Sequence, residues 1–381
     1  MIGGNGWASD DDDFSRIDQA LDQQFQGIDD DLDAQYLRID QALETAYQRF
    51  AQAIEAQWGK DDVVLPDRKR WVDYSDDLSV RRTFDFEQGV LKVEKVVPAD
   101  TSKESVLDEL RKAAGEASRD TETDLARKDQ AVAYARKLLG GADVELSAPK
   151  SYDAKPVLAD IVSPAGIEKV SAKSLTETPV APVSRAKAKK VAIEIPYEGD
   201  YRLAMARRYE DTVLQQANVH GIEPSLIFAI IETESSFNPR ARSGAPAYGL
   251  MQLVPTSGAM DAYQFLFNQK KLLDPEYLYN PEQNITLGVG YFKLLVSRYL
   301  AAVTDRSSRE YCAIAAYNTG AGNVARAFTN TTSPKQAAKI INKMSAGQVF
   351  DHMREKLPYE ETQRYIVKVT DAQRRYRSFD I

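Results

Sequence analysis

The sequence ESSFNPRARSGAPAYGLMQ, which runs from Glu234 to Gln252, decides the fold of the last part of this chain. It follows the apolar segment LIFAII at 226–231, so a carboxylate comes at the end of an apolar helix. A turn-rich loop with Gly and Pro follows, and we expect a short helix to start at 249–252. A carboxyl group in an apolar wall has its charged form disfavoured, so its pKa rises and it holds a proton near neutral pH. The pattern therefore predicts that Glu234 is an acid beside a cleft.

Length and hydropathy set the limits for the rest of the chain. Its 381 residues predict two or three domains. The sequence has no run of eighteen or more apolar residues, so it predicts no membrane-spanning helix. The opening residues 1–6 have no basic n-region and no apolar h-region, unlike a signal peptide. We expect a protein that is either cytosolic or has lost a targeting segment.

Cysteine and histidine are scarce. Cys312 is the one cysteine, which rules out an intramolecular disulfide, and its apolar neighbours predict that it packs in the core. With only two histidines, His220 and His352, the sequence excludes metal sites built from cysteine and histidine. An ion held by carboxylates alone stays open, but we expect no metal and no cofactor.

The charge is unevenly distributed. Residues 1–60 hold 13 Asp and Glu against 4 Lys and Arg, a net charge of −9, whereas the whole chain carries −8. Residues 191–381 hold 20 acidic against 22 basic side chains, a net charge of +2. An acidic first segment argues against nucleic acid and anionic lipid as its partners.

The first segment, 1–58, contains an internal repeat: RIDQAL at 16–21 recurs at 38–43. Apolar residues recur from Phe14 to Trp58 in steps of three, four and four, a period of eleven residues. This period, about 3.67 residues per turn, predicts one long helix with a continuous apolar stripe. The stripe could pack on the protein's own surface, mediate self-association or, least in keeping with its acidic polar face, contact a membrane.

The second segment, 59–196, reads as an α+β domain. Alternating residues at 80–86 and 90–96 flank the turn at 87–89 and predict a hairpin. A strand is also expected at 191–196. Further expected features are a capping box at 101–104 opening a helix through Leu110, a helix at 124–139, and a largely irregular connection at 142–187.

The third segment, 197–381, is nearly all helical in its pattern. Pro224 and Pro281 stand where a first helical turn accepts proline, and 307–310 reads as a capping box. The expected helices are 201–219, 224–235, 280–300, 307–318, 333–344 and 359–377. The overall fold class is therefore α+β, with a long N-terminal helix, a small α+β domain and a mostly α third domain.

Five motifs of the third segment together resemble the lysozyme-like catalytic domain of lytic transglycosylases of the soluble-lytic-transglycosylase type. They occur in this order: ESxFNP at 234–239, Ser243, GLMQ at 249–252, AYN at 316–318 and RYIxKV at 364–369. The second segment resembles the family of membrane-bound murein transglycosylase C at WGKD 58–61, VDY 72–74 and the 80–96 hairpin, as do residues 341–354.

The chain departs from these families in three ways. Members of the second family carry a lipoprotein signal and an acylated cysteine, neither of which is visible here. The repeat at 14–58 is not part of the family's pattern. Position 232 is Glu where related chains often have Gln, which puts a second carboxylate two residues from the matched catalyst.

The resemblance implies that Glu234 is the sole acid and base of glycan cleavage. It would protonate the oxygen between N-acetylmuramic acid and N-acetylglucosamine and then take the proton of the muramoyl C6 hydroxyl, which closes a 1,6-anhydro ring. Ordinary glycosidases use two carboxylates, and the sequence shows no clear partner for Glu234. Glu232 lies about 200° around the helix and should point elsewhere.

The same resemblance suggests which residues bind the substrate. Ser243 is matched to a position near the substrate acetamido group, and Tyr317 to a tyrosine that faces the catalytic acid. A polar side chain such as Gln252 can hydrogen-bond sugar hydroxyls or Glu234. The full set of expected substrate-binding residues is Ser243, Met251, Gln252, Tyr317, Asn318 and Tyr365.

Two other functions stay open from the residues. One is a lysozyme-type hydrolase with Glu232 or Asp261 as second acid, and the other is a catalytically silent glycan-binding scaffold. The expected partners are peptidoglycan glycan strands and a cell-wall protein, but not nucleic acid. We expect membrane association only through an anchor not visible in this chain. The resemblance implies a periplasmic location associated with the outer membrane.

Overall fold

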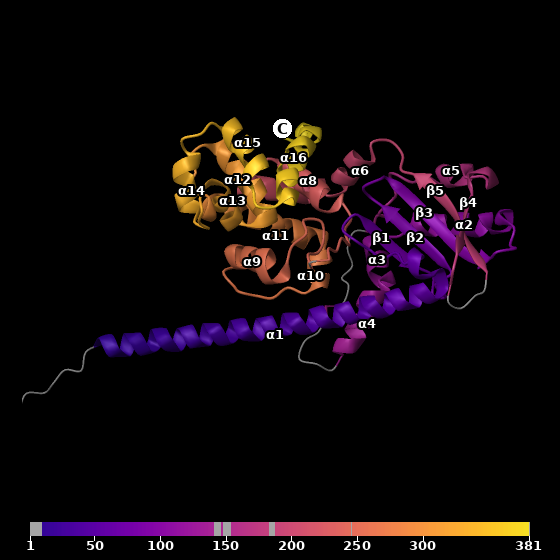
Figure 1. Ribbon diagram of the computed structural model, residues 1–381, viewed down its shortest axis with the longest axis horizontal. Coiled ribbons are helices and arrows are strands. Elements are labelled where there is room, and N and C mark those ends of the chain that lie inside the picture. The colour runs from indigo at the N-terminus through magenta and orange to yellow at the C-terminus, as the bar shows by residue number, and fades with distance from the viewer. Residues whose placement is uncertain (1–9, 141–145, 148–153, 183–186, 245, 381) are drawn as a thin grey trace, which may run out of the picture.

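The computed structural model describes residues 10–140, 146–147, 154–182, 187–244 and 246–380, with only the helical backbone described for residues 10–31. Helix α1 (Asp10–Trp58) runs along one side of the molecule, and its first part extends beyond the body (Figure 1). A sheet domain and a helical domain lie side by side above it (Figure 1). Among the described residues, no helix is both long enough and apolar enough to cross a membrane.

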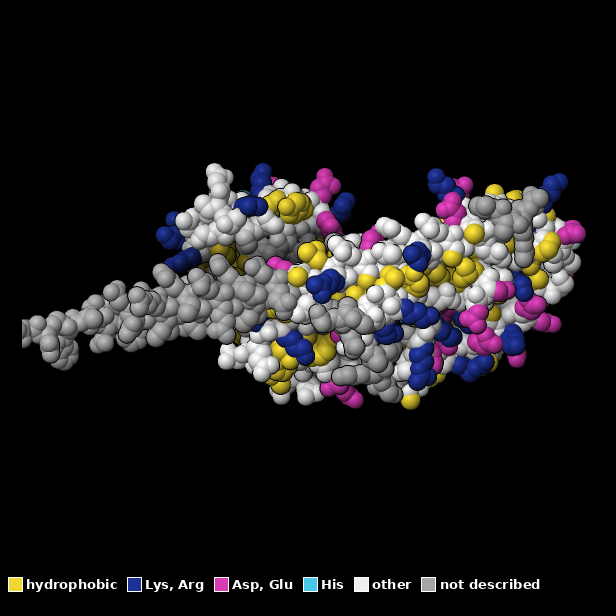
Figure 2. Space-filling model, turned by 90° about the horizontal axis from the view of Figure 1, so that it is seen from below, with side chains coloured by type: hydrophobic (Ala, Val, Ile, Leu, Met, Phe, Trp, Pro, Cys, Tyr) yellow, Lys and Arg dark blue, Asp and Glu magenta, His cyan; other side chains and the backbone are white. Residues whose placement is uncertain are grey.

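The end of α1 packs on the sheet domain and the neighbouring helices. Ile39, Leu43 and Tyr47 are buried against α4 (Gln130–Leu139), and Ile54 and Trp58 are buried against the sheet. The interpretation that the apolar stripe packs on the protein's own surface is therefore confirmed for 39–58; the side chains of the stripe up to residue 31 lie outside the described residues. Seen from below, hydrophobic side chains form a narrow band flanked by charges of both signs (Figure 2).

In the described part of the chain, the sheet has five antiparallel strands in the order β1-β2-β3-β5-β4. Their bounds are β1 Arg70–Tyr74, β2 Val80–Asp85, β3 Val90–Pro98, β4 Thr176–Val180 and β5 Ala188–Pro196. The predicted hairpin is confirmed, with Gly89 at φ +70° in its turn. The predicted strand at 191–196 is the end of β5. The connection at 142–187 is less irregular than expected, because its described part contains α5 (Pro164–Lys169) and β4.

The helices of the sheet domain differ from the prediction at their starts. A 3-10 turn at Lys103–Val106 precedes α2 (Leu107–Ala117), and Ser102 forms no capping hydrogen bond, so the capping box at 101–104 is wrong. The helix expected at 124–139 is two helices, α3 (Glu122–Lys128) and α4. They are separated at Asp129, whose side chain caps α4 by accepting from the Val132 amide.

The third domain consists of helices and loops. Its α-helices are α6 Tyr201–Arg208, α7 Glu210–His220, α8 Pro224–Ser235, α9 Met260–Phe267, α10 Pro275–Tyr279, α11 Pro281–Leu294, α12 Arg306–Thr319, α13 Ala321–Phe328, α14 Pro334–Ile341, α15 Ala346–Lys356 and α16 Glu360–Arg375. The prediction of α8 is confirmed at both ends. The fold class predicted from the sequence, with a nearly all-helical third part, is confirmed.

Two local predictions in this domain are wrong, and a third is confirmed. Residues 249–252 form a turn, and the next helical residues are a π-helical turn at Pro255–Ala259 that leads into α9. Asp305 caps α12 by accepting the Ser308 amide, so the capping box predicted at 307–310 is wrong and the cap lies two residues earlier. Cys312 is fully buried in α12, which confirms its core position.

Candidate active site

Helix α8 delivers Glu234 to the wall of a cleft. Its apolar run is buried, and the helix stops at Ser235 because Ser236 adopts the left-handed conformation with φ 50°. Phe237 follows with φ 66°. A residue other than glycine in this left-handed conformation costs of the order of 1–3 kcal/mol. The buried Phe237 ring, stacked 6.5 Å from Tyr209, holds this turn in place. The strained backbone therefore comes directly after Glu234, at the helix end that must be fixed to hold the carboxylate in place.

The cleft beside Glu234 has a volume of about 390 Å³. It is lined by Arg68, Glu234, Ser243, Ala247, Gln252, Leu253, Val254, Ser257, Gly258, Tyr291, Tyr317, Asn318, Thr319 and Gly320. Among these described residues Glu234 is the one carboxylate. A single acid thus faces a cleft wall that is otherwise made of hydroxyls, amides, one arginine and apolar side chains.

Burial raises the pKa of Glu234 from 4.5 to about 6. Three neighbours oppose the rise: the Tyr365 hydroxyl, the Arg68 guanidinium and the Lys69 ammonium group. The carboxylate of Glu361 adds to it. The carboxyl group can therefore hold a proton close to neutral pH, as the sequence predicted, and its conjugate base has cations nearby.

Ser243, Gln252 and Asn318 line the cleft together with Glu234. The Ser243 hydroxyl accepts the Ala247 amide at 3.2 Å, and the Asn318 Oδ1 accepts the Thr362 hydroxyl at 2.7 Å. Gln252 donates from Nε2 to two backbone carbonyls, while its Oε1 has no hydrogen-bond partner in the described structure. These predicted substrate-binding residues are thus gathered around one space.

Met251 and Tyr317 are placed differently from what the sequence suggested. Met251 is fully buried, and its side chain packs closely against Gly288 instead of lining the cleft. Its carbonyl accepts the hydroxyl of Tyr317 at 2.9 Å. Tyr317 lines the cleft, but its hydroxyl is directed to this carbonyl and not to Glu234. The resemblance allows this hydroxyl to orient either the carboxylate or the substrate acetamido group, and the geometry does not show the first of these.

Tyr365, on α16, is the tyrosine next to the acid. Its hydroxyl is buried and lies outside regular hydrogen-bond geometry with Glu234, although it still lowers the pKa of that carboxyl. Burial, followed by the charge of Glu234, raises the pKa of Tyr365 well above its usual value. The Tyr365 hydroxyl therefore keeps its proton over the whole working range and can donate a hydrogen bond to Glu234 when that group is a carboxylate.

The two candidates for a second acid lie elsewhere. Glu232 accepts the Tyr376 hydroxyl at 2.6 Å and pairs with Arg375 and, at 3.4 Å, with Arg202. It therefore points away from the cleft, as its position around the helix predicted. Asp261, on α9, is not among the residues that line the cleft. Neither carboxylate faces Glu234 across the space where a glycosidic bond would lie.

Arg68 and Lys69 are site residues that sequence reasoning missed. They lie in the loop before β1, in the sheet domain, and Arg68 lines the cleft with its Nη1 4.0 Å from Glu234 Oε2. The only signal in the sequence is the basic triplet RKR at 68–70, which reads equally well as a solvated surface. Their position beside Glu234 comes from the packing of two domains.

A buried ion cluster holds these domains together. Arg240, six residues after the acid, donates to Asp129 at 3.0 Å and to Glu276 at 2.9 Å. Asp129 belongs to the sheet domain and Glu276 to α10, and all three side chains are buried. The guanidinium also lies 4.1 Å from the centre of the Tyr279 ring. Because a buried charge is costly unless paired, this cluster favours one relative position of the two domains.

Two family models match the chain in different places. The Transglycosylase SLT domain matches residues 211–340, and the N-terminal domain of membrane-bound lytic murein transglycosylase C matches residues 36–117. The second match begins inside α1. The statement that the repeat helix lies outside the family's pattern is therefore wrong for its second half.

Curated relatives cover most of the chain. Membrane-bound lytic murein transglycosylase C of Cronobacter sakazakii is 31% identical over 325 residues, which span 84% of this chain and 85% of that protein. The same-named protein of Salmonella typhimurium is 32% identical over 331 residues, with 84% and 85% covered. Among solved structures, the 70-kDa soluble lytic transglycosylase of Escherichia coli matches with a TM-score of 0.34 and 26% identity. That match covers 45% of this chain and 24% of that one.

Proposed function

The chain belongs to the family of membrane-bound lytic murein transglycosylase C, and from this premise we propose that Glu234 is its single catalytic acid and base. The chain is a peptidoglycan lytic transglycosylase. The reaction breaks the β-1,4 bond between N-acetylmuramic acid and N-acetylglucosamine and leaves a 1,6-anhydromuramoyl end. One observation carries the assignment: Glu234 is the one carboxylate among the described residues of the cleft, and its pKa is raised to about 6.

In the first step Glu234 acts as an acid. Its proton goes to the glycosidic oxygen, the bond from that oxygen to the muramoyl C1 breaks, and the acetamido oxygen of the same sugar stabilises C1. A pKa near the working pH serves this step, because the group is protonated often enough and still gives up its proton readily. Arg68 and the Tyr365 hydroxyl stabilise the carboxylate that is left behind.

In the second step the Glu234 carboxylate acts as a base. It takes the proton of the muramoyl C6 hydroxyl while that oxygen forms a bond to C1 and displaces the acetamido oxygen. No water is consumed, and Glu234 ends protonated, as it began. Because the substrate supplies its own nucleophile, the enzyme needs no second carboxylate, unlike glycosidases that use a pair.

The residues around the cleft have supporting roles in this proposal. Ser243, Gln252 and Asn318 are placed to hydrogen-bond sugar hydroxyls and the acetamido group. Tyr317 and Met251 act as a coupled pair that shapes the wall, and the Tyr365 hydroxyl lies beside Glu234 and can donate to the carboxylate once that forms. The hydrolase and scaffold alternatives gain no support from the position of Glu232 or from the family.

The family also implies a location in the cell envelope. We propose, more narrowly, that the protein works in the periplasm at the outer membrane and is held there by an anchor outside the features visible in this chain. A cell-wall protein that binds the sheet domain or the long helix belongs to the same proposal.

Mass spectrometry of muropeptides tests the assignment. Purified peptidoglycan is digested with the protein and with Glu234→Gln, which keeps the shape of the side chain and removes its proton transfer. We expect anhydro products from the protein and a loss of turnover of at least about 10³-fold in the variant, since one group serves both steps.

Glu232→Gln is the matched control, because it changes a carboxylate two residues away that points out of the cleft. Its products should stay anhydro and its turnover should remain within roughly tenfold of the original, the range of an indirect effect. Full activity of Glu234→Gln, or an equal loss in both variants, would overturn the assignment.

A further inference from the structure

The loop before β1 reaches from the sheet domain to the end of the helix that carries Glu234. The Lys69 ammonium group donates to the backbone carbonyls of Glu232 at 2.9 Å and Thr233 at 2.7 Å. These carbonyls belong to the last turn of α8, where the helix dipole is negative and a cation is stabilising. The cation thus comes from another domain, across about 160 residues of sequence.

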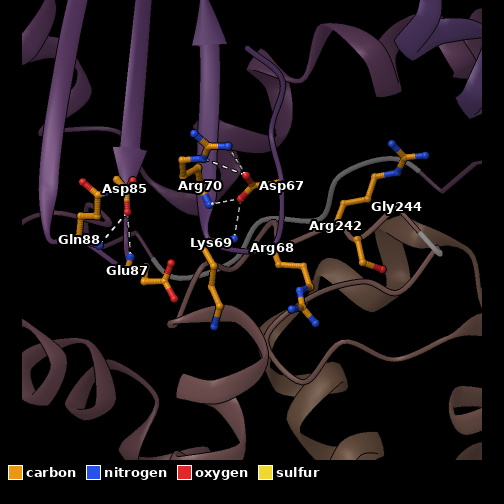
Figure 3. A pocket seen from close by; sticks show the side chains of 10 residues that line it. Asp67, Arg68, Lys69, Arg70, Asp85, Glu87, Gln88, Arg242 and Gly244 are labelled. Carbon is orange, nitrogen blue, oxygen red and sulfur yellow. Dashed lines mark hydrogen bonds and ion pairs between the residues drawn. The ribbon is translucent and has the colours of Figure 1, made fainter. Parts of the chain in front are cut away.

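Arg68, the preceding residue, faces the carboxylate itself. Its Nη1 lies 4.0 Å from Glu234 Oε2 and 3.8 Å from Glu361 Oε1, and two fifths of the side chain is exposed. It lines the catalytic cleft, a neighbouring hollow with Thr233 and Tyr365, and a third hollow at the domain junction. Figure 3 shows Arg68 and Lys69 leaving the loop on the same side, towards the helical domain.

The backbone of this loop is tied to both domains. Asn238, four residues after the acid, donates its side-chain amide to the carbonyl of Asp67 at 3.1 Å and to that of Arg68 at 3.4 Å. The Asp67 carboxylate binds the Arg70 guanidinium at 2.6 and 2.8 Å, so these two charges satisfy each other (Figure 3). Of the three basic residues at 68–70, Arg70 pairs with Asp67 within the loop, and Lys69 donates to the carbonyls at the end of α8. Arg68 is the residue of the three whose charged group faces the Glu234 carboxylate.

We propose that Arg68 is a positioning residue for the catalytic carboxylate, so that the sheet domain completes the active site of the helical domain. The proposal rests on the role of Glu234 as acid and base. When Glu234 has given its proton to the leaving oxygen, a buried carboxylate forms, and Arg68 stabilises and orients it for the C6 hydroxyl. Lys69 and Asn238 keep Arg68 within reach of Glu234.

Among the described residues, the charged and titratable groups around Glu234 come from three elements. The loop before β1 supplies Arg68 and Lys69, α16 supplies Glu361 and Tyr365, and α12 supplies Tyr317. The tyrosines stay protonated because their pKa values are raised well above the usual value. Glu361 lies 3.8 Å from the same Arg68 nitrogen and competes for it, so Arg68 and Glu361 should act on the catalytic carboxylate in opposite directions.

The test is the pH dependence of kcat/KM on purified glycan strands. In the free enzyme the alkaline limb of this profile reports the loss of the Glu234 proton. Arg68→Gln removes the charge and keeps a long polar side chain. It should move the limb upward by about one pH unit, the low end of the effect of an opposite charge 4–6 Å away, because Arg68 is partly exposed. The plateau should fall as well, since the carboxylate is less stable.

Three further variants complete the test. Arg68→Lys should keep the limb near its original position, and Glu361→Gln should move it downward by a smaller amount. Arg127→Gln, which alters an exposed arginine of the sheet domain on α3, should leave the profile unchanged. If the alkaline limb of the kcat/KM profile stays in place in both Arg68→Gln and Glu361→Gln, the proposal is overturned, whatever happens to the plateau value of kcat/KM. Activity in Glu234→Gln would instead overturn the proposed function, so the two failures are distinguishable.

Discussion

Replacing Glu234 by Gln should stabilise the folded protein above pH 6, although it removes the proposed catalytic group. Burial raises the pKa of Glu234 from 4.5 to about 6, so between these values the folded state binds a proton that the unfolded state has released. The free energy of unfolding must therefore fall as pH rises through this window. A rise of about 1.5 pH units at 1.36 kcal/mol per unit amounts to about 2 kcal/mol. Gln does not titrate in this range, so the free energy of unfolding of the variant should not fall by this amount.

The assay is urea unfolding of both proteins at several pH values from about 4.5 to 7, read as a difference in the free energy of unfolding. The difference should be smallest at the acid end, grow with pH and level off above pH 6 at about 2 kcal/mol more than its acid value. Glu361→Gln, which changes a largely exposed carboxylate near the same site, should show little of this dependence. A difference that does not change with pH would refute the argument that burial holds the proton on Glu234.

Three substitutions test the packing that positions the site, each by urea unfolding. Arg240→Met should cost about 3–5 kcal/mol because Asp129 and Glu276 would be left buried without their cation, and a cost under about 1 kcal/mol would contradict this role. Gly249→Ala should cost at least about 2 kcal/mol, because φ is +78° and a Cβ atom would lie 2.3 Å from the Leu278 carbonyl oxygen; unchanged stability would show that this turn relaxes. Trp58→Ala should cost about 3–5 kcal/mol, since the ring is fully buried, donates to the Leu78 carbonyl at 2.7 Å and lies 4.2 Å from the Arg81 guanidinium. A small effect there would mean that the end of α1 is not needed by the sheet.

The sequence was a reliable guide where local chemistry decides the structure. The hairpin of β2 and β3 follows from alternation and a glycine turn, and α8 follows from Pro224 and an apolar run that ends at Ser235. The position of Glu232 followed from helix geometry alone. In these cases the interactions that matter lie within a few residues of each other, so the pattern determines the result.

For other features, the sequence was compatible with more than one helix start, or it contained no pattern that predicts the structure. Asp305 caps α12 although a serine two residues later offered an equally plausible cap, and short helices such as α10 and α13 carry too few turns for a periodic pattern. The basic triplet before β1 is typical of a solvated surface. Only the docking of two domains places Arg68 at Glu234, and nothing local in the sequence records that docking.

The positions of the tyrosines show the same limit. Both Tyr317 and Tyr365 were expected near the substrate, but which hydroxyl reaches the acid depends on how α12 and α16 pack around α8. The Tyr317 hydroxyl donates to the Met251 carbonyl, whereas Tyr365 is the tyrosine that lies beside Glu234. A short motif predicts which residue type lies at a site, but the hydrogen-bond partner of that residue depends on the tertiary structure.

The central claim is that one carboxylate cleaves the glycan and that the substrate, not water, supplies the nucleophile. The most direct measurement is digestion of purified peptidoglycan in water enriched in ¹⁸O, followed by mass spectrometry of the new muramoyl ends. We predict 1,6-anhydro ends that carry no ¹⁸O and that disappear with Glu234→Gln. New ends that carry ¹⁸O would mean that water attacks C1, and this would contradict the single-carboxylate mechanism.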